Sequence, residues 1–283
     1  MSTPVTVVGA TGKLGRHVVQ RLQARGVPVI PVVRSPEKLE PALQKVARRF
    51  DLELPETYRP ALAGTRVLVS CVHGRYGTGL MAALPPDVER IVLMGSTRIF
   101  SKVPDPNIPR LQATAAALAA CGIPAVMLHP TMIYGADGEN NLQRIAAYIR
   151  RLGVIPLPDG GKTKLQPIHV EDVAACVDAA LQRDEAVGEP IVIAGPDRLS
   201  YRELVLAVGN AIGRQPLILP VPGLLLEAAA LLTSALPFLP RIRRDEVRRL
   251  AEDKTFPIDD MLRRLAVTPL PLAEGLRRTF SRL

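Results

Sequence analysis

The stretch VTVVGATGKLGRHVVQRL, Val5 to Leu22, begins as an apolar run of β-branched residues and ends with apolar residues at helical spacing. Gly9, Gly12 and Gly15 lie three residues apart where the strand and the helix should meet. Glycines at such a junction let backbone N–H groups approach a diphosphate, and the amino end of the helix adds about half a positive charge. The stretch therefore predicts the nucleotide-binding end of an α/β fold.

Three glycines can also build a turn that holds no ligand, but their place between a first strand and an amphipathic helix favours nucleotide binding. Gly9 would permit the tight turn, Gly12 the close approach of the phosphates, and Gly15 the packing of helix on strand. The residues expected to contact the dinucleotide in this stretch are Gly9, Thr11, Gly12, Lys13, Leu14 and Gly15.

The second apolar run, Val29 to Val33, leads into Arg34 and Ser35 in the sequence VVRSPEKL. NAD-preferring sites place an Asp or Glu at about this distance from the glycines, where it accepts hydrogen bonds from the ribose hydroxyls. Arg34 could instead hold a 2′-phosphate with two parallel N–H donors, and Lys13 could reach the same phosphate from the glycine loop. We therefore predict NADP(H) as the cofactor, and the alternative is a solvated Arg34 with no ligand.

Apolar runs alternate with helical patterns through the first half of the chain, which is typical of a parallel sheet covered by helices on both faces. A chain of 283 residues with 47% hydrophobic composition can also bury a large core. We predict an α/β, doubly wound parallel sheet of the Rossmann type over residues 1–135 and a smaller lobe over residues 136–283, with a return to the sheet near residues 190–194. The expected strands are Val5–Val8, Val29–Val33, Val67–Val72, Ile91–Met94 and Ala125–Leu128, and the expected helices are Arg16–Arg25, Pro36–Arg49, Leu142–Leu152 and Val170–Arg183.

The net charge of +9 raises nucleic acids, anionic membranes and polyanionic ligands as partner classes. No basic run is long, and 4% aromatic residues with no Trp argue against a nucleic-acid partner. Cys71, Cys121 and Cys176 lack metal-ligand spacing, so we expect no metal site, no disulfide and a reducing compartment. The amino terminus lacks a basic region followed by an apolar run, and we expect a cytoplasmic location.

Five motifs together resemble the extended and atypical branches of the short-chain dehydrogenase/reductase superfamily: GATGKLG, VVRSPEKL, VLMGST, MLHPTMIYG and LQPIHVEDVA. The carboxyl-terminal sequence, LILPVPGLLLEAAALL followed by LPRIRRDEVRRLAEDKTF, is most similar to the branch that contains the NADPH-holding accessory subunit of respiratory complex I and its bacterial relatives. The resemblance covers nearly the whole chain. It implies further cofactor contacts: Asp51 and Leu52 beside the adenine, Cys71, Val72 and His73 beneath the adenosine ribose and diphosphate, and His129, Pro130, Thr131 and Met132 along the nicotinamide.

Active members of the superfamily carry a Tyr and, four residues later, a Lys as the proton-transfer pair. None of the five tyrosines here has a Lys at that spacing, and the expected place of the pair falls near Asn107 and Leu111. The remaining catalytic candidates are Ser96, His129 and Tyr134, the last expected at the mouth of the cleft. Each has a structural alternative: Ser96 as a cap, His129 bonded to backbone, and Tyr134 packed between the lobes.

Without the Tyr and Lys pair, three functions remain as alternatives. We predict first an NADPH-dependent reductase of a small-molecule substrate, quinone-like or a small carbonyl compound, because a quinone-like acceptor can take its proton from water. The main alternative is a protein that holds NADPH as a structural or sensing ligand and docks on a partner. A sugar-nucleotide epimerase or dehydratase is the third, and the missing Tyr disfavours it.

Residues 215–240 carry a single charge, Glu227, and several arginines follow up to Arg249. Only about 14 consecutive residues escape proline, and they would reach about 21 Å as a helix against a hydrocarbon core of about 30 Å. The stretch therefore cannot span a membrane. Residues 215–249 could instead associate peripherally with a membrane or with a protein partner, or form an intramolecular helix with a solvated basic face.

Overall fold

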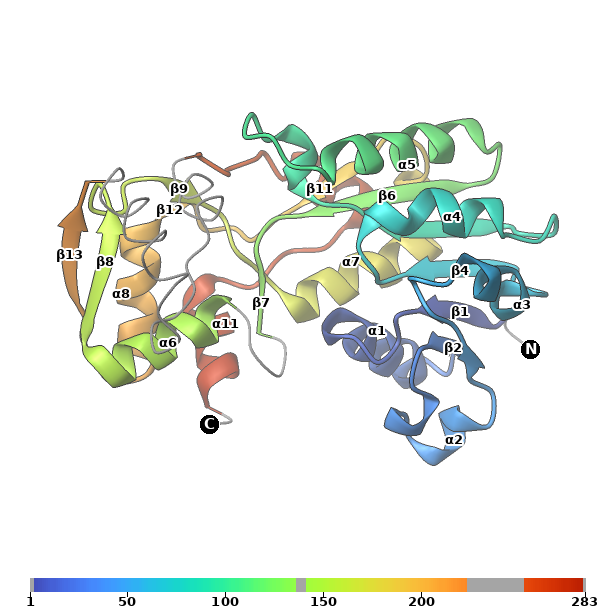
Figure 1. Cartoon of the computed structure of the whole chain (residues 1–283), viewed down its shortest axis with the longest axis horizontal. Helices are drawn as coiled ribbons and strands as arrows, with labels where there is room; N and C mark the ends of the chain where they lie inside the picture. The colour runs from blue at the N-terminus through green and yellow to red at the C-terminus, as the bar shows by residue number, and fades with distance from the viewer. Residues whose placement is uncertain (1–2, 136–140, 223–251, 282–283) are drawn as a thin grey trace.

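The computed structural model describes residues 3–135, 141–222 and 252–281 of the chain. Seven strands form its centre: β1 (Val5–Val8), β2 (Val29–Val33), β3 (Arg48–Arg49), β4 (Val67–Ser70), β5 (Arg90–Met94), β6 (Ala125–Pro130) and β11 (Ile191–Ile193). They make one fully parallel sheet in the order β11-β6-β5-β4-β1-β2-β3 (Figure 1). The predicted α/β, doubly wound parallel sheet is confirmed, although β4 ends two residues before its predicted end and β6 continues two residues beyond its own.

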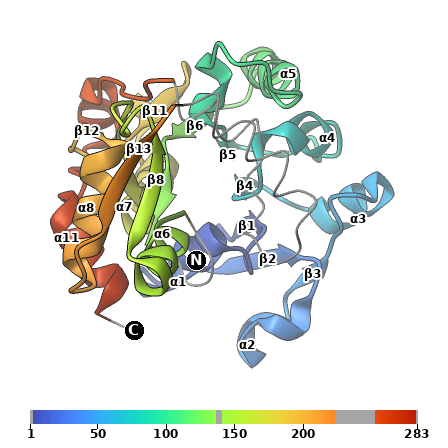
Figure 2. The same ribbon diagram turned by 60° about the vertical axis from the view of Figure 1, so that its left-hand side comes forward.

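Different helices cover the two faces of this sheet (Figure 2). On one face lie α1 (Lys13–Ala24) and α7 (Val170–Gln182), and on the other lie α3 (Tyr58–Leu62), α4 (Gly77–Ala82) and α5 (Ile108–Ala120). Val7 packs into the core of the first face and Val8 into that of the second, because successive side chains of a strand point in opposite directions. The near-continuous apolar runs of the sequence are thus buried on both sides.

The helix predicted for Pro36–Arg49 is wrong. The segment forms a 3₁₀ turn, Pro36–Lys38, a one-turn helix α2 (Pro41–Gln44) and the edge strand β3, which pairs with β2. Each proline begins its own turn, where the missing N–H is not needed. A helix running on from Pro36 would have placed Pro41 in its interior, where the ring and the missing N–H break the hydrogen-bond ladder.

The strand order reverses beside β1. The chain runs from β1 to β2 and β3 on one side and then crosses to β4 on the other. The connections after β1 and β4 therefore leave the sheet toward opposite faces. In folds of this kind, ligands bind at the carboxyl ends of the two strands between which the order reverses. The glycine stretch after β1 lies at that place.

A second lobe lies beside the sheet (Figure 1). Its elements within the described ranges are β7 (Ile133–Tyr134), α6 (Asn141–Leu152), β8 (Val154–Pro158), β9 (Lys164–Leu165), β10 (Ile168–His169), β12 (Leu199–Ser200), α8 (Tyr201–Ala211), β13 (Leu217–Val221) and α11 (Leu272–Phe280). A π-helical turn (Met261–Leu265) precedes α11 and packs with α7 into the core on the first face of the main sheet. Between α7 and β12 the chain returns to the main sheet, where β11 pairs with β6. No helix among the described residues is both long and apolar enough to cross a membrane. Most of the segment 215–249, for which a membrane or protein partner was predicted, lies outside the described residues.

Candidate functional site

The turn between β1 and α1 is too tight for side chains at two of its glycines. Gly9 has a φ of +79°, in the left-handed region that favours glycine. A Cβ on Gly15 would lie 2.1 Å from the carbonyl oxygen of Gly9, and a Cβ on Gly9 would lie 2.7 Å from Cγ1 of Val72. The glycines therefore bring the first turn of α1 against the end of β1 and against the loop that follows β4.

The amino end of α1 lies at this turn. Within the described ranges no side chain caps the helix, whose N-cap is Gly12, and its first turn holds no acidic residue. Gly12 and Lys13 are exposed and Thr11 is half-buried, whereas Leu14 is buried in the core. The first N–H groups of a helix carry a partial positive charge and require acceptors. The oxygens of a diphosphate would supply both the acceptors and the negative charge.

The loops after β2 and β4 lie beside the glycine turn. Gly9 N donates to the Val32 carbonyl at 2.9 Å, and Cys71 N donates to the last carbonyl of β1 at 2.9 Å. Arg34 comes two residues after Val32, with an exposed side chain, and Ser35 is half-buried. The fold therefore brings the predicted phosphate-binding loop, the predicted 2′-phosphate ligand and the loop after β4 to one edge of the sheet.

The two residues predicted beside the adenine lie next to the Arg34 loop. Phe50 N donates to the Val33 carbonyl at 3.0 Å, which sets Asp51 and Leu52 beyond the end of β2. The hydroxyl of Tyr58 donates to the Leu52 carbonyl at 2.7 Å and fixes this corner. The position agrees with a role along the outer edge of a dinucleotide.

His73, also predicted beside the cofactor, caps a short turn. Its Nδ1 accepts from Arg75 N at 3.2 Å, and burial lowers the pKa of the imidazole. The Arg75 side chain in turn donates to Oδ1 of Asn107 at 3.3 Å. Near the place where the superfamily keeps its Tyr, this chain thus has an amide paired with an arginine, a pair that no local sequence pattern indicated.

The predicted nicotinamide end follows β6. Thr131 N donates to the Ile193 carbonyl at 3.1 Å, and the Met132 carbonyl accepts from Ile168 N at 3.0 Å, so Pro130 to Met132 are held between the sheet and the second lobe. Oγ1 of Thr131 is buried and has no hydrogen-bond partner in the part of the chain that the structure describes. A buried hydroxyl without a partner carries a free-energy cost that a polar ligand would remove. This hydroxyl and the uncapped helix fit the two ends of a dinucleotide.

His129 lies inside β6, and its ring hydrogen-bonds to the backbone of Ser96, just beyond the end of β5. The side chain is 1% exposed, and Nδ1 lies 3.0 Å from the backbone nitrogen and 3.1 Å from the backbone oxygen of Ser96. A Cβ on Gly95 would lie 2.3 Å from this nitrogen, so the glycine makes room for the ring. Burial lowers the pKa of His129 to about 4, and the ring is therefore neutral at pH 7. The hydroxyl of Ser96 accepts from Arg98 N at 3.2 Å as the cap of a turn, so both residues match their structural alternatives.

Tyr134 was predicted at the mouth of the cleft, but it lies inside the second lobe. It is 1% exposed, and its ring packs edge-on against His169 with 5.2 Å between centroids. A Cβ on Gly275 would lie 2.0 Å from the Tyr134 hydroxyl oxygen, so α11 is pressed against the ring. Burial raises the pKa of the phenol, and the nearby carboxylates of Asp172 and Asp197 raise it further. A phenol with a raised pKa is a weaker proton donor.

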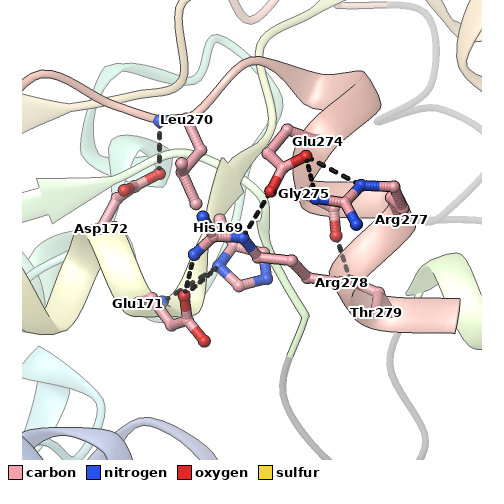
Figure 3. Close-up of polar contacts among 9 residues, drawn as sticks. All are labelled: His169, Glu171, Asp172, Leu270, Glu274, Gly275, Arg277, Arg278 and Thr279. Atoms are coloured by element: carbon pink, nitrogen blue, oxygen red, sulfur yellow. Dashed lines mark hydrogen bonds and ion pairs between the residues drawn. The ribbon is translucent and has the colours of Figure 1, made fainter. Parts of the chain in front are cut away.

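Polar contacts join α11, and the segment before it, to the start of α7 (Figure 3). Nδ1 of His169 accepts from Glu171 N at 3.3 Å, and Asp172 accepts from a backbone N–H of the segment before α11 at 2.9 Å. The Arg278 guanidinium joins the start of α7 to α11 by donating to Glu171 at 2.8 Å and to Glu274 at 2.9 Å. The sequence pattern around Tyr134 gave no sign of this cover, because α11 lies more than a hundred residues further along the chain.

A second carboxyl-terminal contact lies beside His129. The ring of Phe256 is 5.7 Å from that of Phe100, which is itself 5.7 Å from the imidazole of His129. The Glu252 carboxylate accepts from the hydroxyl of Ser101 at 2.6 Å. These aromatic and polar contacts were missed in the sequence, since the partners are about 150 residues apart and share no local pattern.

A family model described as NAD(P)H-binding matches residues 9–184, which is more than half of the chain. The chain belongs to this NAD(P)H-binding family. The match begins at Gly9 and extends beyond the end of α7, so it includes the glycine turn, the Arg34 loop and the residues at the end of β6.

The NAD(P)H-binding chain is also similar to two relatives that share one name, "NADH dehydrogenase [ubiquinone] 1 alpha subcomplex subunit 9, mitochondrial". It is 27% identical to the Arabidopsis thaliana protein over 249 residues, and this alignment covers 80% of the present chain and 62% of the plant protein. It is 25% identical to the Mus musculus protein over 300 residues, and this alignment covers 96% of the present chain and 79% of the mouse protein. The chain thus spans less than two thirds of the length of the plant relative. The resemblance to this branch is confirmed.

Among solved structures, triphenylmethane reductase of Citrobacter sp. complexed with NADP(H) has the same fold. The TM-score is 0.75 with 19% sequence identity, and the superposition covers 99% of this chain and 100% of the reductase. At this identity the likeness concerns the fold alone.

The buried His129 predicts a pH-dependent loss of stability. The folded protein holds the imidazole at a pKa of about 4, whereas the unfolded chain binds a proton below about pH 6.5, so stability falls as the pH falls from 6.5 toward 4. At 1.36 kcal/mol per pKa unit, the loss amounts to about 3 kcal/mol. Urea unfolding of the native chain and of H129Q at several pH values measures it. The native chain should lose more stability than the variant across this range, and parallel pH profiles would contradict the assignment.

Proposed function

We propose that this chain holds NADP(H) as a structural or sensing ligand and docks on a protein partner. The observation that carries the proposal is the state of the two candidate proton donors. His129 is neutral and hydrogen-bonded to the Ser96 backbone. Tyr134 is buried against α11, and the pKa of its phenol is raised. A site built for carbonyl reduction would need a positioned acid for the developing alkoxide.

The choice of NADP(H) over NAD(H) rests on Arg34. Its exposed guanidinium follows β2 at the edge of the sheet where an acidic residue would favour NAD, and Lys13 is exposed on the adjoining turn. When bound, NADP(H) supplies a hydride at its nicotinamide. This chain's own residues would bind the diphosphate at the amino end of α1, the 2′-phosphate at Arg34 and the nicotinamide end at Thr131.

The docking part of the proposal rests on the relatives. Both are named as subunits of an NADH dehydrogenase. The similarity to the mouse protein covers 96% of this chain. A chain that resembles a subunit throughout, and that keeps the cofactor-binding turn while lacking the Tyr and Lys pair, is suited to using the cofactor for stability or sensing.

A second candidate is a reductase of a quinone-like acceptor. The fold likeness to a triphenylmethane reductase in complex with NADP(H) favours it. A hydroquinone anion spreads its charge over the ring and can take its proton from water, whereas an alkoxide needs a donor in the transition state. This chemistry is compatible with a neutral His129 and a buried Tyr134.

Replacement of Arg34 tests the cofactor. R34A should lose a charge-assisted contact of roughly 1.5–3 kcal/mol, so NADPH binding should weaken by roughly 10- to 100-fold while NADH binding stays nearly unchanged. Isothermal titration calorimetry measures both. R202A, which removes an exposed arginine from α8, is the matched control and should bind NADPH as the native chain does. A native chain that binds NADH as tightly as NADPH would overturn the assignment.

Oxidation of bound NADPH separates the two candidate functions. We expect stopped-flow absorbance to show NADPH retained and no faster oxidation than in free solution, with quinones, aldehydes or ketones as acceptors. Turnover with quinones alone would instead select the reductase. A ketone reduced as fast as a quinone would contradict both candidates, because it would demand a proton donor, and H129Q and Y134F would be the first variants to examine.

A further inference from the structure

The two-stranded sheet of β8 and β13 has one buried and one exposed apolar face. Ile155, Leu157 and Ile218 point inward and belong to the core of the second lobe with residues of α6 and α8. The opposite side chains are Val154 and Pro156 on β8 and Leu217 and Leu219 on β13, and all four are exposed. Figure 1 places these strands at the end of the second lobe farthest from the main sheet. We call this exposed side, together with Leu152 just before β8, the outer face.

The outer face is unusual in how much apolar surface it leaves to water. Leu217 is 66% exposed, Leu152 59%, Leu219 51% and Val154 36%. The strand register sets Leu217 beside Val154 and Leu219 beside Pro156, so these side chains form one contiguous patch. The largest contiguous apolar patch on a protein surface, typically a few hundred Å², is often a functional one.

Prolines block both edges of this sheet. In a parallel pair, every second residue of a strand directs both its N–H and its C=O toward the partner strand. The hydrogen bonds from Leu217 N to Gly153 O and from Asp159 N to Val221 O show which residues do so here. The groups that point away from the partner strand then belong to Val154, Pro156 and Pro158 on β8 and to Ile218 and Pro220 on β13. A proline has no N–H to offer to an added strand. The occupant of this sheet therefore covers its face and does not extend its ladder.

Charge around the outer face favours an anionic occupant. Residues 141–165 and 199–222, which make up α6, β8, α8 and β13 with their connections, carry seven arginines and lysines but only two acidic residues. Arg150, Arg151 and Arg214 are exposed beside the start of the two strands, and Arg214 donates to the carbonyl of Arg150 there. A Cβ on Gly153 would lie 3.2 Å from the Arg214 guanidinium, so this charge lies directly at the end of β8.

The outer face is also small. Strands of five residues are about 16 Å long and lie about 5 Å apart, so two of them present a few hundred Å², well below the roughly 800 Å² per partner that stable protein interfaces bury. A few aliphatic side chains edged by arginines are instead sufficient for attachment to a lipid surface, where each apolar group and each cation contributes separately. We infer that the outer face attaches the protein peripherally to a membrane that contains anionic lipids. The inference uses no residue of the cofactor site and is independent of the proposed function.

Vesicle flotation of the full chain tests the inference. The protein should float with phosphatidylglycerol-containing vesicles at low salt, float much less with pure phosphatidylcholine vesicles, and be released at high salt, where the Debye length falls to about 3 Å at 1 M. The variant L217E/L219E should reduce the apparent partition coefficient by about tenfold or more. The control V46E/L54E adds the same charge at two other exposed apolar positions, in the nucleotide-binding core, and should reduce it by no more than about threefold through net charge alone.

Circular dichroism and NADPH titration of both variants show whether each still folds and binds cofactor. A native chain that stays in solution with anionic vesicles at low salt would overturn the inference, and so would equal partitioning of the two variants. A native dimer that L217E/L219E converts to a monomer, without any vesicle binding, would also overturn it and would assign the outer face to a second copy of the chain.

Discussion

The contact between Gly15 and the carbonyl oxygen of Gly9 is the constraint on which the structure depends. Any side chain on Gly15 would lie 2.1 Å from that oxygen, so α1 can start where it does only with glycine at this position. The approach packs α1 against the sheet and leaves the uncapped amino end of the helix at the carboxyl edge of β1. Because β1 is flanked by β2 on one side and β4 on the other, the same contact gathers the Arg34 loop and the Cys71 loop around the helix end.

Burial explains why neither of the two candidate proton donors, His129 and Tyr134, is available to a dinucleotide at this site. His129 is drawn into the sheet by its bond to the Ser96 backbone, and desolvation keeps it neutral. Tyr134 is covered by α11, which the Arg278 ion pairs hold to the start of α7. Both groups have become part of the packing that joins sheet and lobe. By contrast, Gly12, Lys13 and Arg34 at the phosphate-binding edge and the apolar outer face of β8 and β13 are exposed.

The sequence allowed the prediction of elements whose pattern is local. The apolar runs predicted the central strands, and the glycine spacing with Arg34 predicted the group of loops that the fold brings together. The prediction failed where distant parts of the chain compete. Pro41 begins a separate turn within a segment whose pattern favoured one continuous helix, and α11 buries a tyrosine whose neighbours in sequence indicated an open cleft. The contact of Phe256 with Phe100 could not be predicted, since nothing near either residue points to the other.

The central claim is that the chain binds NADP(H) at the β1–α1 turn without presenting an acid to the reacting end of the cofactor. A crystal structure of the chain grown with NADP⁺ tests this most directly. The account predicts the diphosphate on the first N–H groups of α1, the 2′-phosphate within hydrogen-bond distance of Arg34, and no ionisable side chain within hydrogen-bond distance of a carbonyl placed against the nicotinamide. A dinucleotide bound elsewhere, or a His, Lys or Tyr side chain directed at that carbonyl position, would contradict it.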